Sequence, residues 1–235
     1  MIMYTDKEYT QTKRIILGVE KMKVEFLPLV EWIDKTYDVK TINIIYDTID
    51  QGERPRLQIC FEFEYEKLKF TNQGITYFDK EKQEAIGKEF KKCLSTQGII
   101  KEKSIFDFLK KADKPKYLTE NIWVVYGAFE PIAKMEATSK IPAEVIQTLK
   151  ESLNNDTIWE ISISFSSATY FFYTDNQLKQ FDNLEVKKIW TDKYFELVKK
   201  YDEFDYFKRE ATTIYFDSKE NFDNNYQSSW FYYYK

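Results

Sequence analysis

The sequence contains no histidine. Without an imidazole, the chain cannot build a Ser-His-Asp or Cys-His catalytic site, and it lacks the commonest protein ligand of zinc and copper. Its two cysteines, Cys60 and Cys93, are too few for a four-ligand zinc site. A disulfide between them and a reactive thiol both stay open, but no histidine is present to activate either sulfur, and we expect reduced, unreactive thiols and no metal site.

Glycine and proline are also scarce, with 6 and 5 residues. The isolated glycines of "NQGI" and "TQGI" match neither G-x-G-x-x-G nor G-x-x-x-x-G-K-[ST], so no nucleotide-binding loop and no cofactor is predicted. The sequence has no block of basic residues, and we therefore do not expect nucleic acid as a direct partner.

Long apolar runs are missing as well. No segment approaches the roughly 18 apolar residues of a membrane span. The N-terminal segment "MIMYTDKEYTQTKR" lacks the apolar core of a secretory signal. These features predict a cytoplasmic protein that does not associate with a membrane.

Aromatic and charged residues are plentiful. Aromatic residues make up 18% of the 235 residues and charged residues 31%, which is typical of a folded, soluble chain. The net charge is −4, and residues 201–235 hold seven acids against four bases. A mildly acidic surface attracts basic partners, although an ordinary solvated surface explains the same composition.

Hydrophobic periodicity predicts alternating helices and strands. In the first half we expect a helix at 13–37 that Pro28 kinks or divides, strands at 41–47 and 56–66, a short strand at 75–78, helices at 79–95 and 104–112, and a strand at 121–130. In the second half we expect a helix at 141–155, strands at 158–165 and 169–174, a helix at 184–201, a strand at 212–216 and a short helix or ordered loop at 217–226.

The predicted fold class is therefore α+β, with antiparallel sheets and helices packed on them. Helix, hairpin and helix follow one another in both halves, so two similar halves and an internal duplication are one interpretation. The division would separate residues 1–135 from residues 136–235, with the irregular segment 131–142 as the boundary. A single domain is the other interpretation.

The strand predicted at 56–66 alternates strictly. Its apolar positions, which we expect to face the core, are Leu57, Ile59, Phe61, Phe63 and Tyr65. Its other face would carry Glu62, Glu64 and Glu66 at successive positions about 6–7 Å apart. These carboxylates suit a hard cation, lysines on a neighbouring strand, or simple solvation, and the last two are the default interpretation.

The chain ends with "WFYYYK", residues 230–235. Its aromatic residues favour a buried strand that is covered on both faces, and a partner-binding platform is the alternative. In the strand at 158–165, the alternation predicts that Trp159, Ile161, Ile163 and Phe165 point inward.

Residues 158–197 carry a further pattern. A Trp-led strand, a Ser-containing turn, an aromatic strand with an acidic end and a helix with a Lys-Ile-Trp run follow one another, at positions Trp159, Ser166, Phe172, Asp175, Lys188, Ile189, Trp190 and Tyr194. This pattern resembles the core of the YezG-type bacterial immunity proteins. The chain is longer than the usual single domain of that family, and the acidic run expected after the aromatic strand is diluted to "TDNQLKQFDN".

The resemblance implies an antitoxin that binds a cognate toxin, such as a basic nuclease, and blocks it by occlusion without catalysis. On this interpretation Glu62, Glu64, Glu66, Asp175 and Asp182 are candidate partner contacts, because acidic side chains steer basic partners. The alternatives are a carboxylate-based hydrolase, with or without a divalent ion, and a structural protein. The oligomeric state stays open.

Overall fold

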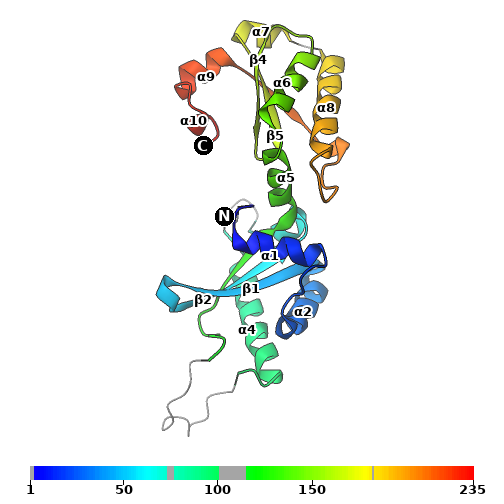
Figure 1. Cartoon of the computed structure of the whole chain (residues 1–235). Coiled ribbons are helices and arrows are strands. Elements are labelled where there is room, and N and C mark those ends of the chain that lie inside the picture. The colour runs from blue at the N-terminus through cyan, green and yellow to red at the C-terminus, as the bar shows by residue number, and fades with distance from the viewer. Residues whose placement is uncertain (1–2, 73–76, 101–114, 182) are drawn as a thin grey trace. The chain divides into compact units, whose positions relative to one another are not determined.

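The computed structural model describes residues 3–72, 77–100, 115–181 and 183–235. The chain divides into two compact units, which we call the first unit (residues 1–130) and the second unit (residues 131–235). Each unit combines one three-stranded sheet with helices, so the predicted α+β class is confirmed (Figure 1). In the described part of the chain, no helix combines the length and the apolar character that a membrane crossing requires.

The sheet of the first unit contains β1 (Thr41–Ile49), β2 (Arg54–Phe61) and β3 (Trp123–Ala128), in that order. β1 and β2 form the predicted antiparallel hairpin, which a short turn at Asp50–Gly52 closes. β3 pairs in parallel with β2, because the helices between them return the chain to the same end of the sheet. The sheet is thus mixed rather than purely antiparallel.

Helices cover both faces of this sheet. The helices of this unit are α1 (Lys7–Ile16), the 3₁₀ turn Val24–Phe26, α2 (Leu27–Tyr37), α3 (Glu64–Leu68) and α4 (Lys80–Thr96). A further helix, α5 (Phe129–Ser139), begins at the end of this unit, and all but its first two residues belong to the second unit. α2 and α4 lie on one face and α1 on the other (Figure 1). The helix predicted at 13–37 is divided, as the prediction allowed, but the break lies before Pro28: α1 ends at Ile16, and Pro28 stands in the first turn of α2.

The main core of the first unit lies between the sheet and the pair α2–α4. Leu57, Ile59 and Phe61 of β2 are completely buried there, as their alternation predicts. The opposite face of β2 is buried too, since α1 packs over it and over β1. The predicted solvated acidic face of this strand is therefore wrong.

The strand predicted at 56–66 ends at Phe61 instead. After it the chain turns at Phe63 and enters α3, where Glu66 accepts hydrogen bonds from the backbone N–H groups of Phe63 (2.9 Å) and Lys40 (2.7 Å). A carboxylate at the third position of a helix satisfies N–H groups that the helix leaves unpaired. Glu62, Glu64 and Glu66 consequently do not share a strand face, and Tyr65 is exposed.

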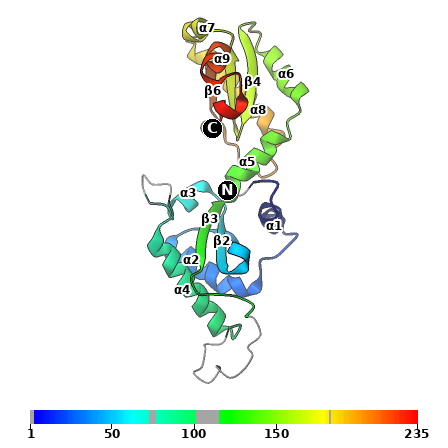
Figure 2. The same ribbon diagram turned by 90° about the vertical axis from the view of Figure 1, so that its left-hand side faces the viewer.

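The second unit repeats this topology. Its sheet contains β4 (Ile158–Ser164), β5 (Ser167–Phe172) and β6 (Ile214–Ser218); β4 and β5 are antiparallel, and β6 is parallel to β5. The helices are α6 (Ala143–Ser152), α7 (Asp175–Gln180), α8 (Leu184–Lys199), the 3₁₀ turn Arg209–Ala211, α9 (Lys219–Tyr226) and α10 (Trp230–Tyr233). α6 and α8 lie on one face of the sheet, and α9 and α10 lie on the other (Figure 2).

Details of register repeat as well. The first strand of each sheet has an irregularity near its start, between Thr41 and Asn43 in β1 and between Ile158 and Glu160 in β4. The buried positions of the long helices have the same spacing: Ile86, Gly87, Phe90, Cys93 and Leu94 in α4, and Trp190, Thr191, Tyr194, Leu197 and Val198 in α8. Residues can therefore be matched between the units, and we call matched residues counterparts.

The bulge in β4 changes which side chains face the core. Ile158 and Ile161, three residues apart, are buried in it. Trp159 points to the opposite face, where it contacts Phe222 and Trp230, and Phe165 is exposed. The prediction that Trp159 and Phe165 point inward was wrong. Strict alternation fails at the bulge beside Trp159, and Phe165 lies beyond the end of β4 in the turn to β5, with a φ of 56°.

The aromatic C-terminus is a short helix, α10, and the predicted strand was wrong. Its rings nevertheless pack onto the sheet through Phe171. Two further predictions, the helix at 104–112 and the first half of the strand at 75–78, fall on residues outside the described part of the chain. Within that part, Thr71 and Phe78 form an isolated antiparallel bridge.

The cap at Glu66 generates a stability prediction. Glu66→Ala leaves two backbone N–H groups without their acceptor, and we expect the free energy of unfolding to fall by about 2–3 kcal/mol. Urea unfolding followed by circular dichroism measures it. Glu64→Ala is the matched control: it removes only an ion pair with Lys67 near the surface (2.7 Å), and we expect a loss below about 1 kcal/mol. Equal losses in the two variants would contradict the assignment.

Candidate partner-binding groove

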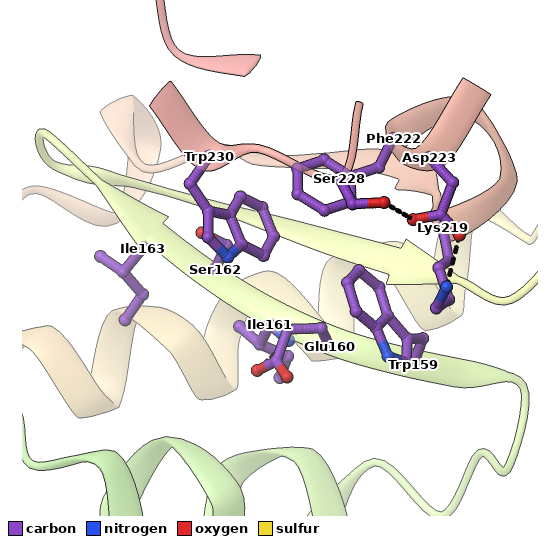
Figure 3. Close-up of a pocket in the computed structure, with 10 residues that line it drawn as sticks. All are labelled: Trp159, Glu160, Ile161, Ser162, Ile163, Lys219, Phe222, Asp223, Ser228 and Trp230. Atoms are coloured by element: carbon purple, nitrogen blue, oxygen red, sulfur yellow. Dashed lines mark hydrogen bonds and ion pairs between the residues drawn. The ribbon is translucent and has the colours of Figure 1, made fainter. Parts of the chain in front are cut away.

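A groove of about 520 Å³ runs along β4 in the second unit. Its walls come from β4, α9 and the segment leading into α10, and its lining includes Trp159, Glu160, Ser162, Lys219, Phe222 and Trp230 (Figure 3). We call it the β4 groove. Charged, polar and apolar side chains all line it, which suits a ligand with both apolar and charged parts.

Short-range hydrogen bonds and turn residues near the C-terminus form the wall of the groove that α9 and the segment before α10 provide. The Ser218 hydroxyl accepts a hydrogen bond from the Asn221 N–H (2.9 Å) and so caps α9. Gln227 and Ser228 adopt positive φ angles (56° and 53°), which end the helix and reverse the chain. The Ser228 hydroxyl donates to Asp223 (2.7 Å), and the reversal brings Trp230 back over Phe222.

An aromatic cluster holds the groove together. The Trp159 and Trp230 rings are nearly parallel, with 7° between their planes and 6.1 Å between their centroids. Phe222 lies 4.3 Å from Trp230 by centroid, and Phe171 of β5 lies 5.3 Å from it. Because Phe171 is completely buried, these rings are the cover of the outer face of the sheet and not a loose end of the chain.

Two tyrosine hydroxyls fix the position of α10. Tyr233 donates to a carboxylate oxygen of Asp217 (2.6 Å), and Tyr234 donates to the Ser162 hydroxyl (2.7 Å). Burial, and after it the hydrogen bond to the Asp217 carboxylate, raises the pKa of Tyr233. Tyr233 thus stays protonated and keeps its donor role across the physiological pH range.

The charges of the β4 groove are unevenly compensated. The Lys219 ammonium lies 5.2 Å from the centroid of the Trp159 ring and is paired with Asp223. The hydrogen bonds from Lys219 and Ser228 hold the pKa of the Asp223 carboxyl below its usual value. Glu160, in contrast, accepts only from the N–H of Ile161 (3.3 Å), and no ammonium or guanidinium in the described part of the chain pairs with it.

The acids predicted as partner contacts lie elsewhere, and most are engaged. Glu62 pairs with Lys40, and Glu64 pairs with Lys67. Glu66 is 4% exposed, so its carboxylate serves the fold of the first unit. Asp175 is half-buried at the start of α7 and accepts a hydrogen bond from the Ser218 hydroxyl. Asp182 lies outside the described residues.

Several residues of the immunity-protein pattern have core positions. Phe172, Trp190 and Tyr194 are buried in the second unit, where the Tyr194 hydroxyl donates to the Ser166 carbonyl (3.1 Å). Ile189 is exposed on the same helix. The pattern therefore describes mostly how α8 packs on β5, and Trp159 is its one residue that lines the groove.

Two other kinds of site, a metal site and a reactive cysteine, were checked in the described part of the chain. Among those residues, no three histidine, cysteine, aspartate or glutamate side chains converge as metal ligands would. Cys60 and Cys93 are buried and unpaired, and burial raises the pKa of the Cys60 thiol to about 12. A thiol with so high a pKa is a poor nucleophile at neutral pH.

The sequence alone offers Trp159 through the resemblance and Trp230 through the alternative of an aromatic partner-binding platform, but it does not single out Glu160. The sequence does hold one signal for Glu160, which is the one charged residue of the strand "IWEISIS". A carboxylate in an otherwise uncharged strand is costly to bury without a hydrogen-bond or ion-pair partner. The convergence of β4 with the C-terminal segment depends on long-range packing. Compared with protein-family models, with curated proteins and with solved structures, the chain gives no match in any of the three.

The hydroxyl of Tyr233 generates the next prediction. Tyr233→Phe keeps the ring contacts but removes the hydrogen bond to Asp217, so we expect a loss of about 1–2 kcal/mol in the free energy of unfolding. Tyr232→Phe is the control, because Tyr232 is 49% exposed, and we expect no measurable change. Thermal unfolding of both variants measures the difference. A Tyr233→Phe variant as stable as the wild type would show that α10 is not held in this way.

Proposed function

We propose that the protein is a non-catalytic protein-binding module of the immunity or antitoxin type, which acts in the cytoplasm and neutralises a basic toxin, such as a nuclease, by occlusion. The observation that carries the proposal is the β4 groove, with its aromatic walls and the uncompensated carboxylate of Glu160. Tryptophan and tyrosine are enriched at the energetic centres of protein interfaces, and exposed aromatic surface is a mark of partner binding.

The distribution of charge supports the same proposal. Residues 131–235 contain 17 acidic and 13 basic side chains, whereas residues 1–130 contain 22 of each, so the whole net charge of −4 belongs to the second unit. A negative unit raises the association rate of a positive partner, and this effect weakens with salt. The aromatic groove and the excess of acids thus occur in the same half of the chain.

The neighbouring surface adds apolar area. Phe231 and Tyr232 of α10 are 71% and 49% exposed. Both stand beside Trp230, which lines the groove. Large aromatic side chains left exposed next to a groove extend the surface that a protein partner can cover.

The carboxylate-based hydrolase is favoured less. Such an enzyme needs an acid and a base that converge on one site with carboxyl groups held apart for the substrate. Of the acids that the sequence suggested, Glu62 and Glu64 are paired with lysines, and Glu66 serves as a helix cap. A structural role is supported by no particular feature of the surface.

The experiment first searches the genes flanking this one for a basic secreted toxin and then assays its inhibition; flanking genes that encode no toxin would count against the proposal. We expect the purified full-length chain to bind that toxin at a 1:1 ratio and to inhibit it stoichiometrically. We also expect the association rate to fall on the order of tenfold between low and high salt. Stopped-flow association and residual toxin activity are the readouts.

A toxin that keeps full activity with the chain in molar excess would contradict the proposal. So would turnover of a toxin substrate by the chain itself. The salt dependence is checked against a chain with six acids of residues 131–235 replaced by their amides at exposed positions, which should associate slowly at every salt concentration.

A further inference from the structure

α1 packs on the outer face of the first sheet through two contacts. The Asn43 amide of β1 donates a hydrogen bond to the Thr12 hydroxyl (2.9 Å). Tyr9 stacks on Phe129, with 5.0 Å between the ring centroids and 9° between their planes. Tyr9 and Thr12 are the two buried residues of α1, so Asn43 and Phe129 define where this helix binds the sheet.

The strand registers identify the counterparts of these two positions in the second unit. Asn43 pairs with Cys60 directly after the bulge of β1, and Glu160 pairs with Phe171 directly after the bulge of β4. Ala128 and Ser218 close β3 and β6, so the residues that follow them, Phe129 and Lys219, are counterparts as well.

Both counterparts line the β4 groove. Glu160 stands in β4 where Asn43 stands in β1, and Lys219 begins α9 where Phe129 begins α5. Figure 3 shows Glu160 and Lys219 among the lining residues. The β4 groove is therefore the position at which the first unit carries a helix. In the second unit α10, which covers this face together with α9, has only four residues, compared with ten in α1. Its rings lie over Phe171 and touch β4 at Trp159 and Ser162, and the groove lined by Glu160 and Lys219 stays open beside them.

The change from asparagine to glutamate determines what fits there. Asn43 uses its amide N–H to bind a hydroxyl, but an ionised glutamate only accepts hydrogen bonds and carries a negative charge. An occupant must therefore bring a donor, and a cationic donor is the best match. Trp230, 38% exposed, lines the same groove and adds apolar surface for the occupant.

We propose that the β4 groove binds a short amphipathic helix of the partner protein, with an arginine or lysine opposite Glu160. By analogy with Tyr9 and Thr12, an aromatic residue three positions before the basic one would lie over Lys219. This inference rests on the proposed protein-binding function and adds the form and charge of the segment that is recognised.

The test uses a stapled peptide as the probe. A peptide of residues 3–20, closed by a lactam between positions 10 and 14, keeps α1 helical in isolation, and both positions are exposed in the protein. It is made with Thr12 and with Thr12→Arg. Isothermal titration calorimetry against the full-length chain should show the Thr12→Arg peptide binding about tenfold more tightly than the Thr12 peptide.

Two variants of the full-length chain connect this preference to the groove. Glu160→Gln keeps the shape of the side chain and should remove the preference for the Thr12→Arg peptide. Glu144→Gln makes the same change of charge at an exposed position of α6 and should leave the preference intact. Circular dichroism confirms that both variants fold like the wild type.

Three outcomes would overturn the inference: no binding of the Thr12→Arg peptide, equal binding of both peptides, or a preference that survives Glu160→Gln. Equal binding would point to α1 of a second copy as the occupant. The outcome is separable from that of the proposed function. If the toxin is inhibited equally well by the Glu160→Gln chain, the proposed function stands and the proposed helix-binding site is wrong. If the Thr12→Arg peptide binds but no toxin is inhibited, the helix-binding site stands and the proposed function is wrong.

Discussion

Each three-stranded sheet of this protein carries buried side chains on both faces, and both faces must therefore be covered. In the second unit the constraint is clearest at β5, where Tyr170 and Phe172 face α8 while Phe171 faces the C-terminal segment, and all three are buried. A central strand with aromatic residues on both sides is stable only between two layers. The aromatic residues at the C-terminus meet this requirement, since Trp230 and Tyr233 pack on Phe171.

The two units meet the requirement differently, and the difference produces the candidate site. In the first unit, α1 covers the outer face along β1, with Asn43 and Phe129 as its contacts. In the second unit, α10 is shorter and its ring cluster shields Phe171, so the surface along β4 stays accessible as a groove. Glu160 is left there without a cation, and its neighbours are tryptophans. A repeated fold with one incomplete layer thus yields a surface suited to a basic segment of another protein.

Periodicity predicted the parts of the fold that depend on local sequence. The helices α4 and α8 and both hairpins followed from apolar spacing, because an amphipathic pattern must face one core. The failures have specific physical causes. A helix cap at Glu66 ended a strand that alternation would have continued, and a bulge before Glu160 turned Trp159 outward. The parallel pairing of β3 and β6 depends on contacts distant in sequence, and the groove, which needs β4 and α10 together, could not be predicted for the same reason.

The most direct measurement of the central claim is hydrogen–deuterium exchange of the full-length chain with and without its bound protein partner. Amide protection reports which backbone segments a partner covers or rigidifies. The account predicts that added protection concentrates in residues 159–163 of β4 and 219–230 of α9 and the following turn, while β1 and β2 exchange as in the free chain. Protection that spares these two segments and appears instead around Glu62 and Glu64 would contradict it.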